Sequence, residues 1–562
     1  MNVVVLYSEG DAKSTEVAKL YEAERDLPPG HLCGLPGFTP ADTQIDVATY
    51  QTKVAAPFDA CLSALPHPEE IDIVVLVRGL PYQVNLPVYT ASLEAMIQVG
   101  HAKVVATGEE LAGLGQPDAS ASVPNPLFNQ GWYFNPADST VQNQYSAWYA
   151  SAAKIVRRKE QPASFRRKDV APGGQYDLSN NLFIVQSLDG FDYEDAKAVV
   201  ARGKASDGTL PKAEILCMRG EDEARAARDP ECELATRMLA GAGFTATFLD
   251  PFDGALAGHE VMAYFTGSAD TVKNAIAGNT YAPGAIACNL TSFGAAISNF
   301  ACNADGSQCP GSEAQTSIAR FIRAGASGAH GTVNEPYNNV FPNAGTLLFY
   351  TFGYSMGESF LFNQRFLYWQ NIHVGDPLAT PYAKRPVVTI SADTSAVVVK
   401  ATHEAGVARI DLYESGARVA QIEGASELTY PSPGKAGDSV DLLAVAVAND
   451  SEVPREGWPE PVQSPRPAVQ GWLAEKVVLS DPSTSTGGGG AGGDTGGSSS
   501  GGGGSGGGGT GGSSSGSAPS KGDCACRTHP GDSPSPASPA PGVLLAGLAI
   551  AARLARTRRR SA

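Results

Sequence analysis

The feature that most constrains this fold is an alternation of short apolar runs with amphipathic segments over residues 1–382. Between the runs, apolar residues recur at three- and four-residue spacing, as in Val17, Leu20 and Tyr21, which predicts helices. The runs themselves are almost continuously hydrophobic, as is typical of strands covered on both faces. They are VVVLY, IDIVVLVRG, NLFIVQSLDG, AEILCMRG, ATFLD, HEVMAYFTG, GAIACNL, GAHGTV and NIHVGDPL. Residues 1–385 are therefore predicted to form an α/β domain with a mainly parallel sheet and flanking helices.

The pattern changes after residue 385, where short β-rich runs follow one another at turn-bounded intervals. These runs are VVTI, AVVVKA, VARIDLYESG, RVAQI and VDLLAVAVA. They predict a small β-sandwich over residues 386–480. The stretch VARIDLYESGARVA resembles bacterial Ig-like and fibronectin-type modules, which implies a spacer or a binding platform.

Residues 481–521 are dominated by Gly, Ser and Thr. Such a composition cannot bury enough apolar surface to offset the entropy of ordering, so it predicts a disordered linker. The linker would act as a flexible tether between the folded body and residues 522–562.

The C-terminal segment, residues 522–562, combines Cys524 and Cys526 with a Pro/Ser stretch, an apolar run over 542–552 and an arginine cluster. The run is shorter than the roughly 20 residues of a free-standing membrane helix, which favours a short apolar stop-transfer helix with cytoplasmic arginines. This order of parts resembles the MYXO-CTERM sorting tails of myxobacterial surface proteins. The resemblance implies that Cys524 or Cys526 is the processing and anchoring site, with a sorting machinery and the membrane as partners. The alternative is a solvated basic tail.

A sorted, anchored chain has to be exported, yet Met1 to Tyr7 has the pattern of a core strand and not of a signal peptide. We therefore expect a signal peptide upstream of this start and a location at the cell envelope or surface. A cytoplasmic protein with an accidental tail is the alternative. Cys302 and Cys309 flank a polar loop and are predicted to form a disulfide, as suits an oxidising compartment. Five further cysteines lie in or near apolar elements and are interpreted as buried: Cys33, Cys61, Cys217, Cys232 and Cys288.

The formal net charge of −17, without an evident basic face, argues against nucleic acid as a partner. The sequence has no Walker-type phosphate loop, no zinc-type Cys or His spacing and no nucleophile elbow, so no cofactor and no metal are predicted. Asp189, Glu335 and Asp376 each follow an apolar strand. They are candidates for a polar or cation-binding crevice at the carboxyl ends of the strands, or else they cap turns.

Six phrases in the α/β part occur in the order found in an uncharacterised family of exported bacterial proteins, which this chain resembles over nearly all of residues 1–382. The phrases are SEGDAKSTEVAKLYEAERDLPPGHLCGLP, DIVVLVRGLPYQV, SLDG, PGAIACNLTSFGA, GAHGTVNEPY and HVGDPLATPY. The resemblance implies membership of that family and no particular reaction.

A more distant resemblance links VMAYFTGSAD and GAIACNLTSFG to gingipain-like, caspase-fold cysteine peptidases. In those enzymes a His after one strand deprotonates a Cys at the end of the next. Here Cys288 stands near the place of the nucleophile, but Gly267 and Ser268 stand where His-Gly is expected. His330, in GAHGTV, forms a His-Gly pair one strand later.

Two functions compete on this evidence. The first is a surface-displayed, membrane-anchored protein without catalysis, which serves recognition of a surface ligand, adhesion or envelope assembly. The second is a surface cysteine peptidase-like hydrolase that uses Cys288. The first is preferred because the base is absent from its expected place.

Overall fold

The computed structural model describes five stretches of the chain. They are residues 3–98, 123–124, 183–299, 315–449 and 469–482, with short gaps at 40, 67, 69–70, 87–89, 297–298, 337, 365 and 368–369. Residues 1–485 form one compact unit, and residues 486–562 form a second unit that lies outside the described residues. The predicted disulfide Cys302–Cys309, all of the linker after residue 482, the apolar run of the tail, Cys524 and Cys526 also lie outside them.

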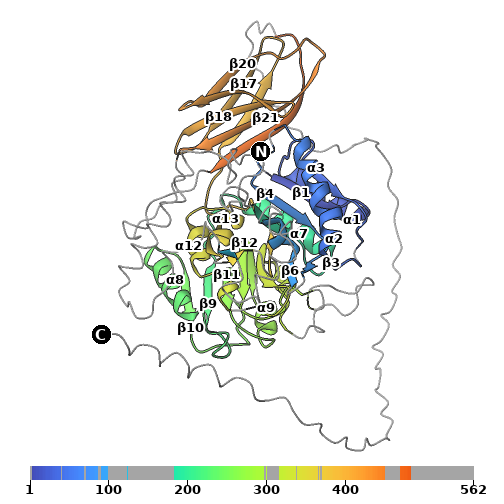
Figure 1. The fold of residues 1–562 in the computed structure, drawn as a ribbon. Coiled ribbons are helices and arrows are strands. Elements are labelled where there is room, and N and C mark those ends of the chain that lie inside the picture. The colour runs from blue at the N-terminus through green and yellow to red at the C-terminus, as the bar shows by residue number, and fades with distance from the viewer. Residues whose placement is uncertain are drawn as a thin grey trace, which may run out of the picture. The chain divides into compact units, whose positions relative to one another are not determined.

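A ten-stranded sheet is the centre of the α/β part (Figure 1). Its order is β10 (Ala246–Leu249), β9 (Glu214–Met218), β11 (Glu260–Thr266), β12 (Thr280–Asn289), β13 (Gly328–Thr332), β15 (Asn371–Gly375), β8 (Ile184–Leu188), β4 (Ile73–Val77), β1 (Val3–Ser8) and β2 (Leu32–Leu35). The pairs from β10 to β13 and from β8 to β2 are parallel, whereas β15 runs antiparallel to β13. The nine predicted runs are all strands of this mostly parallel sheet, so that prediction is confirmed.

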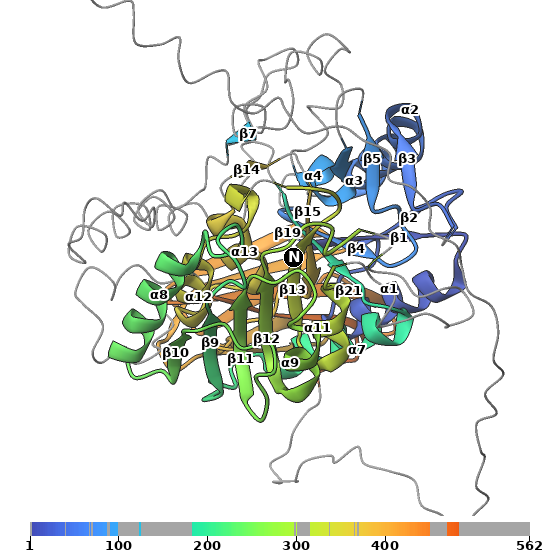
Figure 2. The same cartoon turned by 90° about the horizontal axis from the view of Figure 1, so that it is seen from below.

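Two groups of helices pack on the sheet. One group comprises α1 (Ala12–Glu24), α7 (Tyr193–Ser206), α9 (Lys273–Gly278) and α11 (Ala319–Ala324). The other comprises α8 (Asp229–Gly241), α12 (Gly345–Thr351) and α13 (Met356–Asn363), which Figure 2 shows together and apart from the first group. Because α7 and α13 both contact β8 and β15, every residue of these two strands is buried, as the continuous hydrophobicity predicts.

Shorter elements complete the α/β part. They are α2 (Val47–Tyr50), a π-helical turn (Gln51–Ala55), α3 (Ala56–Ala64), α4 (Leu93–Gln98), a 3₁₀ turn (Asn338–Val340), the small sheet of β3 (Gln44–Asp46), β5 (Gln83–Asn85) and β6 (Thr90–Ser92), and the pair β7 (Val123–Pro124) with β14 (Phe366–Leu367). Within the described ranges, no helix is both long enough and apolar enough to cross a bilayer.

The residues after 386 form two antiparallel sheets. One contains β16 (Val387–Ala392), β17 (Ala396–Thr402) and β20 (Glu427–Pro431), and the other contains β19 (Ala417–Glu423), β18 (Val407–Glu414), β21 (Ser439–Ala448) and β22 (Gln470–Val478). Inward residues of both sheets, such as Val399 and Ile410, share a core separate from that of the α/β part. We call this part the sandwich.

The sandwich contacts the α/β part through Trp472 of β22. The indole Nε1 of Trp472 donates to the carbonyl oxygen of Arg25 at 2.6 Å, and the guanidinium of Arg385 lies 4.7 Å from the indole centroid. Arg385 also pairs with Asp207 at 3.0 Å and donates to the carbonyl oxygen of Gln470 at 2.7 Å. These contacts place one edge of the sandwich against α1 and the end of α7.

One disulfide in the α/β part was not predicted. Cys33 of β2 and Cys61 of α3 are bonded, with their Cα atoms 5.9 Å apart. We interpreted both residues as buried, which holds for Cys33, whereas Cys61 is half-buried. Their bond, which the sequence did not predict, joins an edge strand to a helix 28 residues further along the chain. Cys217, Cys232 and Cys288 are free thiols and are buried, as expected.

Candidate functional site

Cys288 and His330 are brought together by the pairing of their strands. They occupy opposite positions in the parallel pair β12–β13, so their side chains leave the same face of the sheet. The Sγ atom of Cys288 lies 3.5 Å from Nδ1 of His330. The His-Gly pair that stands one strand late in the sequence is therefore next to the candidate nucleophile in space.

Asn371 completes a Cys–His–Asn arrangement. Its Oδ1 atom lies 2.8 Å from Nε2 of His330, so Nε2 carries the proton and Nδ1 presents its lone pair to Cys288. This proton arrangement is the one that a general base for a thiol requires. We call Cys288, His330 and Asn371 the Cys288 triad.

Arg228, directly before α8, occupies the other side of the thiol. Its Nη1 atom donates to the Sγ of Cys288 at 2.9 Å, and the same guanidinium donates to the carbonyl oxygens of Thr266, Cys288 and Pro342 at 3.0–3.2 Å. The guanidinium also lies 4.9 Å from the ring centroid of Phe265. Arg228 thus joins the ends of β11 and β12 to the segment before α12.

Burial controls the protonation of the triad. Cys288 and His330 are both 0% exposed. Burial raises the pKa of the Cys288 thiol, and the nearby Arg228 offsets this only in part. Burial, followed by the neighbouring His373 and by Arg228, holds the pKa of His330 well below its ordinary value. At neutral pH the pair is therefore a thiol and a neutral imidazole, which is a weakly nucleophilic state.

The polar contacts continue across the sheet from the triad to β8. The rings of His330 and His373 lie 4.9 Å apart, and Glu94 accepts a hydrogen bond from the backbone N–H of His373 at 2.8 Å. Ser187 donates to the other oxygen of Glu94 at 2.6 Å. Burial raises the pKa of Glu94, and His373 and Ser187 offset part of this effect. A buried carboxylate needs such hydrogen-bond partners, so the contacts of Glu94 with His373 and Ser187 are interpreted as structural.

Asp189 belongs to a second polar cluster, at the carboxyl ends of β4 and β8. Arg78 Nη1 donates to Asp189 at 2.6 Å, and the hydroxyl of Tyr82 donates to its other oxygen at 2.9 Å. Burial raises the pKa of Asp189, whereas Arg78 lowers it. A very small cavity lies beside Asp189 and is also lined by Tyr82, Glu94 and Ser187. Asp189 therefore has the predicted location, but its charge is already paired.

The structure does not bring the three predicted acids together. Glu335 follows β13, is exposed, and accepts a hydrogen bond from Ser292. Asp376 follows β15 and is fully buried, where it accepts from Arg25 Nε at 2.7 Å and from the Tyr21 hydroxyl at 2.8 Å. Asp376 thus forms an internal ion pair with Arg25. No group of three His, Cys, Asp or Glu side chains in the described part of the chain is arranged to hold a metal ion.

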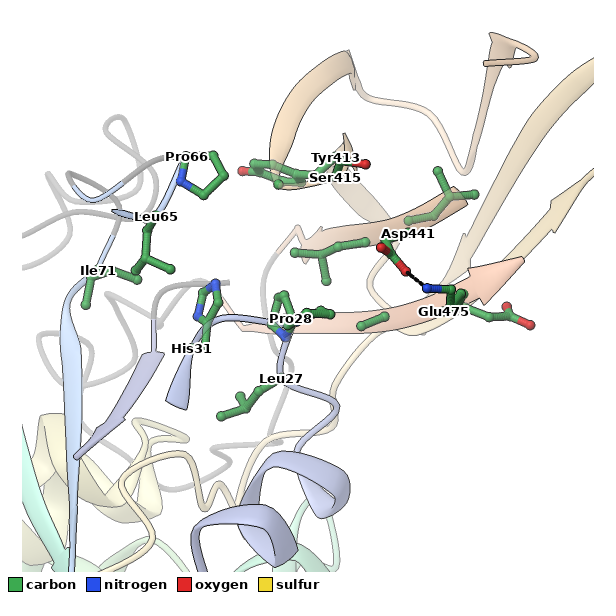
Figure 3. Close-up of a pocket in the computed structure, with 16 residues that line it drawn as sticks. Leu27, Pro28, His31, Leu65, Pro66, Ile71, Tyr413, Ser415, Asp441 and Glu475 are labelled. Carbon is green, nitrogen blue, oxygen red and sulfur yellow. Dashed lines mark ion pairs between the residues drawn. The ribbon is translucent and has the colours of Figure 1, made fainter. Parts of the chain in front are cut away.

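A cavity of about 540 Å³ lies between the α/β part and the sandwich (Figure 3). The α/β wall consists of Leu27, Pro28, Pro29, His31, Leu65, Pro66 and Ile71. The sandwich wall consists of Tyr413, Ser415, Gly416, Asp441, Leu442, Leu443, Ala474, Glu475 and Lys476. We call this space the His31 cavity. Its volume lies within the usual range of small-molecule sites, which often occur between domains.

Sequence reasoning missed Arg228, Asn371, Glu94 and the His31 cavity. Asn371 and His373 are two residues apart on a strand, which places both on one face, so their pattern carried a usable signal. Arg228 and Glu94 carried none, because each meets its partners only through the tertiary fold. The segment LPPGH, which forms part of the α/β wall, belongs to the first of the six family phrases. The opposite wall of the cavity is formed by residues more than 300 positions further along the chain.

Comparisons with known proteins define this protein only by its architecture. It is a protein with a mostly parallel α/β sheet joined to two antiparallel sheets. No family model and no curated protein matches the chain. A solved structure described as "Structure of Protease" is similar at 9% identity over 84% of this chain and 97% of that one, with a TM-score of 0.36. Fibronectin(III)-like modules of Clostridium thermocellum CbhA align at 11% identity over 17% of this chain and 99% of theirs, with a TM-score of 0.11. Likenesses at these TM-scores carry no argument about function.

Proposed function

We propose that this chain is a surface-displayed recognition protein without catalysis of its own. The observation that carries the non-catalytic part of the proposal is the burial of the Cys288 triad: the thiol and the imidazole are each 0% exposed. A substrate has to reach the sulfur within bonding distance, which a fully buried sulfur does not allow. The Arg228 guanidinium holds the sulfur on its other side. These groups serve as a polar core that fixes the ends of the central strands.

The disulfide Cys33–Cys61 supports the exported location in this proposal. Disulfides persist in oxidising compartments and are rare in the bacterial cytoplasm. The α/β part would correspond to a degenerate caspase-like domain, and the sandwich to an Ig-like module. The Gly/Ser linker would then hold this body at a distance from an anchor at Cys524 or Cys526.

The carrying observation is tested by thiol reactivity in the folded protein. The full chain is incubated with iodoacetamide at neutral pH, and modification of Cys288 is followed by peptide mass spectrometry. We expect modification only as fast as the protein opens, so that urea accelerates it steeply. Cys217 and Cys232, which are also buried free thiols, are the internal controls. Rapid native modification of Cys288 alone would contradict the proposal.

The alternative, a cysteine peptidase-like hydrolase, is favoured by one observation. The 3.5 Å contact of Cys288 with His330, and the 2.8 Å contact of His330 with Asn371, reproduce the order nucleophile, base and orienting amide. If this reading is right, an electrophilic peptide probe labels Cys288 in the native chain. Replacing His330 by Ala then abolishes the labelling while the fold persists. No labelling of the wild type would rule it out.

The anchoring part of the proposal has its own test. Mass spectrometry of surface-extracted protein should find the chain cut or attached at Cys524 or Cys526, without the terminal arginines. Replacing both cysteines by Ala should release the protein from the surface or leave Arg558 to Arg560 in place. Surface-extracted protein that keeps the terminal arginines and has both thiols unmodified would contradict the sorting-tail interpretation.

A further inference from the structure

The α/β wall of the His31 cavity contains one polar side chain, the imidazole of His31, which has no role in the proposed function. His31 lies between α1 and β2, is 8% exposed, and its ring stands between Leu65 and Pro28 (Figure 3). Its Nδ1 atom is 2.6 Å from the carbonyl oxygen of Val3. Because a carbonyl only accepts, Nδ1 carries the proton, and Nε2 presents a lone pair.

Nε2 is the ring nitrogen of His31 that is left to accept a hydrogen bond, and His31 lines the cavity. The ring is held at Nδ1 from the side of β1, so Nε2 lies on the side away from Val3. A donor group of a ligand bound in the cavity can reach this lone pair and take the place of water there. Burial also lowers the pKa of His31 to about 4, so the lone pair stays available at neutral pH.

The rest of the cavity specifies the body and the charge of a ligand. Apolar side chains line both walls, among them Leu65, Tyr413 and Leu443. The charged groups in the lining are two carboxylates, Asp441 and Glu475, and one ammonium, Lys476, which is 3.6 Å from Asp441. A ligand anion would therefore find one cation, Lys476, which already has a partner, while Glu475 is exposed and its carboxylate points away from the cavity (Figure 3).

We propose that the His31 cavity binds a small apolar molecule that carries a hydrogen-bond donor and no negative charge. The apolar body fills the space between Pro28, Leu65 and Leu443, and its hydroxyl or N–H group donates to Nε2 of His31. The inference rests on the proposed recognition function and names the class of ligand that this function would serve. It also gives a role to the LPPGH segment, which the Cys288 triad does not use.

Two dyes that share one skeleton and differ by a single sulfonate group test the proposal on the full chain. N-phenyl-1-naphthylamine is neutral, aromatic and carries one N–H donor, whereas 8-anilino-1-naphthalenesulfonate has the same skeleton with a sulfonate. Fluorescence titration should give saturable binding of the neutral dye at one site per chain, and at least about tenfold weaker binding of the anion. Equal affinities, or unsaturable binding of the neutral dye, would overturn the ligand class.

Three variants locate the site. Ala474→Trp places an indole in the cavity from β22 and should abolish binding of the neutral dye, whereas Val387→Trp, on an exposed position of the other sheet of the sandwich, should leave it unchanged. His31→Phe keeps the apolar wall but removes the acceptor, and should weaken binding about tenfold, the equivalent of one neutral hydrogen bond. The unfolding midpoint of each variant shows whether it is folded. Full binding by folded Ala474→Trp would overturn the site.

The two proposals fail separately. Native labelling and turnover at Cys288, together with an intact dye titration, would overturn only the non-catalytic function. An inert Cys288 together with a failed titration would overturn only the His31 ligand class.

Discussion

His330 and His31 are both buried histidines whose proton is fixed by a neighbouring oxygen, Asn371 Oδ1 in one case and Val3 O in the other. The free nitrogen of His330 faces the Cys288 sulfur, which Arg228 also contacts. The free nitrogen of His31 belongs to a side chain that lines an open cavity. The Cys288 triad and Arg228 are buried, and we call them the closed region, whereas His31 lines a cavity. Access distinguishes the two regions more than residue type does.

The largest expected effect comes from removing the central cation of the closed region. Arg228→Met removes the hydrogen bonds to three carbonyl oxygens and to the Cys288 sulfur, although Thr266 O still accepts from the backbone N–H of Leu290, so we expect a loss of on the order of 3 kcal/mol in the free energy of unfolding. Urea unfolding measures it. Arg219→Met, which breaks an exposed pair with Asp250, is the control and should cost less than about 1 kcal/mol.

Binding of the neutral dye sharpens this first prediction. Folded Arg228→Met should bind N-phenyl-1-naphthylamine as the wild type does, because the His31 cavity does not involve the closed region. A variant with unchanged stability would show that the Arg228 contacts contribute little, and a variant with lost dye binding would show that the two regions are coupled.

The next effect concerns the pH dependence of stability. Burial lowers the pKa of His31 from 6.5 to about 4. The imidazole is therefore protonated near pH 6.5 in the unfolded chain but only near pH 4 in the folded chain. The stabilisation is complete above pH 6.5 and is lost as the pH falls toward 4, by on the order of 3 kcal/mol. His330 shifts in the same direction, so the two histidines must be separated by substitution.

Urea unfolding of the wild type and of His31→Phe at pH 7 and pH 4.5 makes this separation. The wild type should lose more stability than the variant on acidification, by about 2 to 3 kcal/mol. Identical losses would show that His31 is solvated and protonates normally, which would also weaken the case for its lone pair as an acceptor in the cavity.

The smallest effect tests the contact that forms the cavity. Trp472→Phe removes the indole donor to the Arg25 carbonyl oxygen and part of the stacking on Arg385, and should cost about 1 to 2 kcal/mol. Dye binding should weaken, because Ala474 on the same strand lines the cavity, while the protection of Cys288 from iodoacetamide stays unchanged. Exposure of Cys288 in this variant would break the distinction between the two regions.

The sequence by itself determined the elements and their class. Strands buried on both faces require continuous hydrophobicity, and amphipathic helices require three- and four-residue spacing, so the nine runs and helices α1, α7, α8, α9 and α11 could be predicted. The antiparallel sheets after residue 386 were also predictable, although β20 and β22 were missed. Strand β2 and helices α12 and α13 were missed as well, because short or fully apolar segments carry weak periodicity.

Only the tertiary structure decided which polar groups meet. Cys288 and His330 are 42 residues apart, and the register of β12 and β13 makes them neighbours. Cys33 and Cys61 pair because α3 returns to β2. Asp376, one of three similar acids in the sequence, forms an internal ion pair with Arg25 and does not line a crevice. Periodicity records which side of an element is buried, and it contains no information about the partner across the fold; that partner is set by strand order and packing.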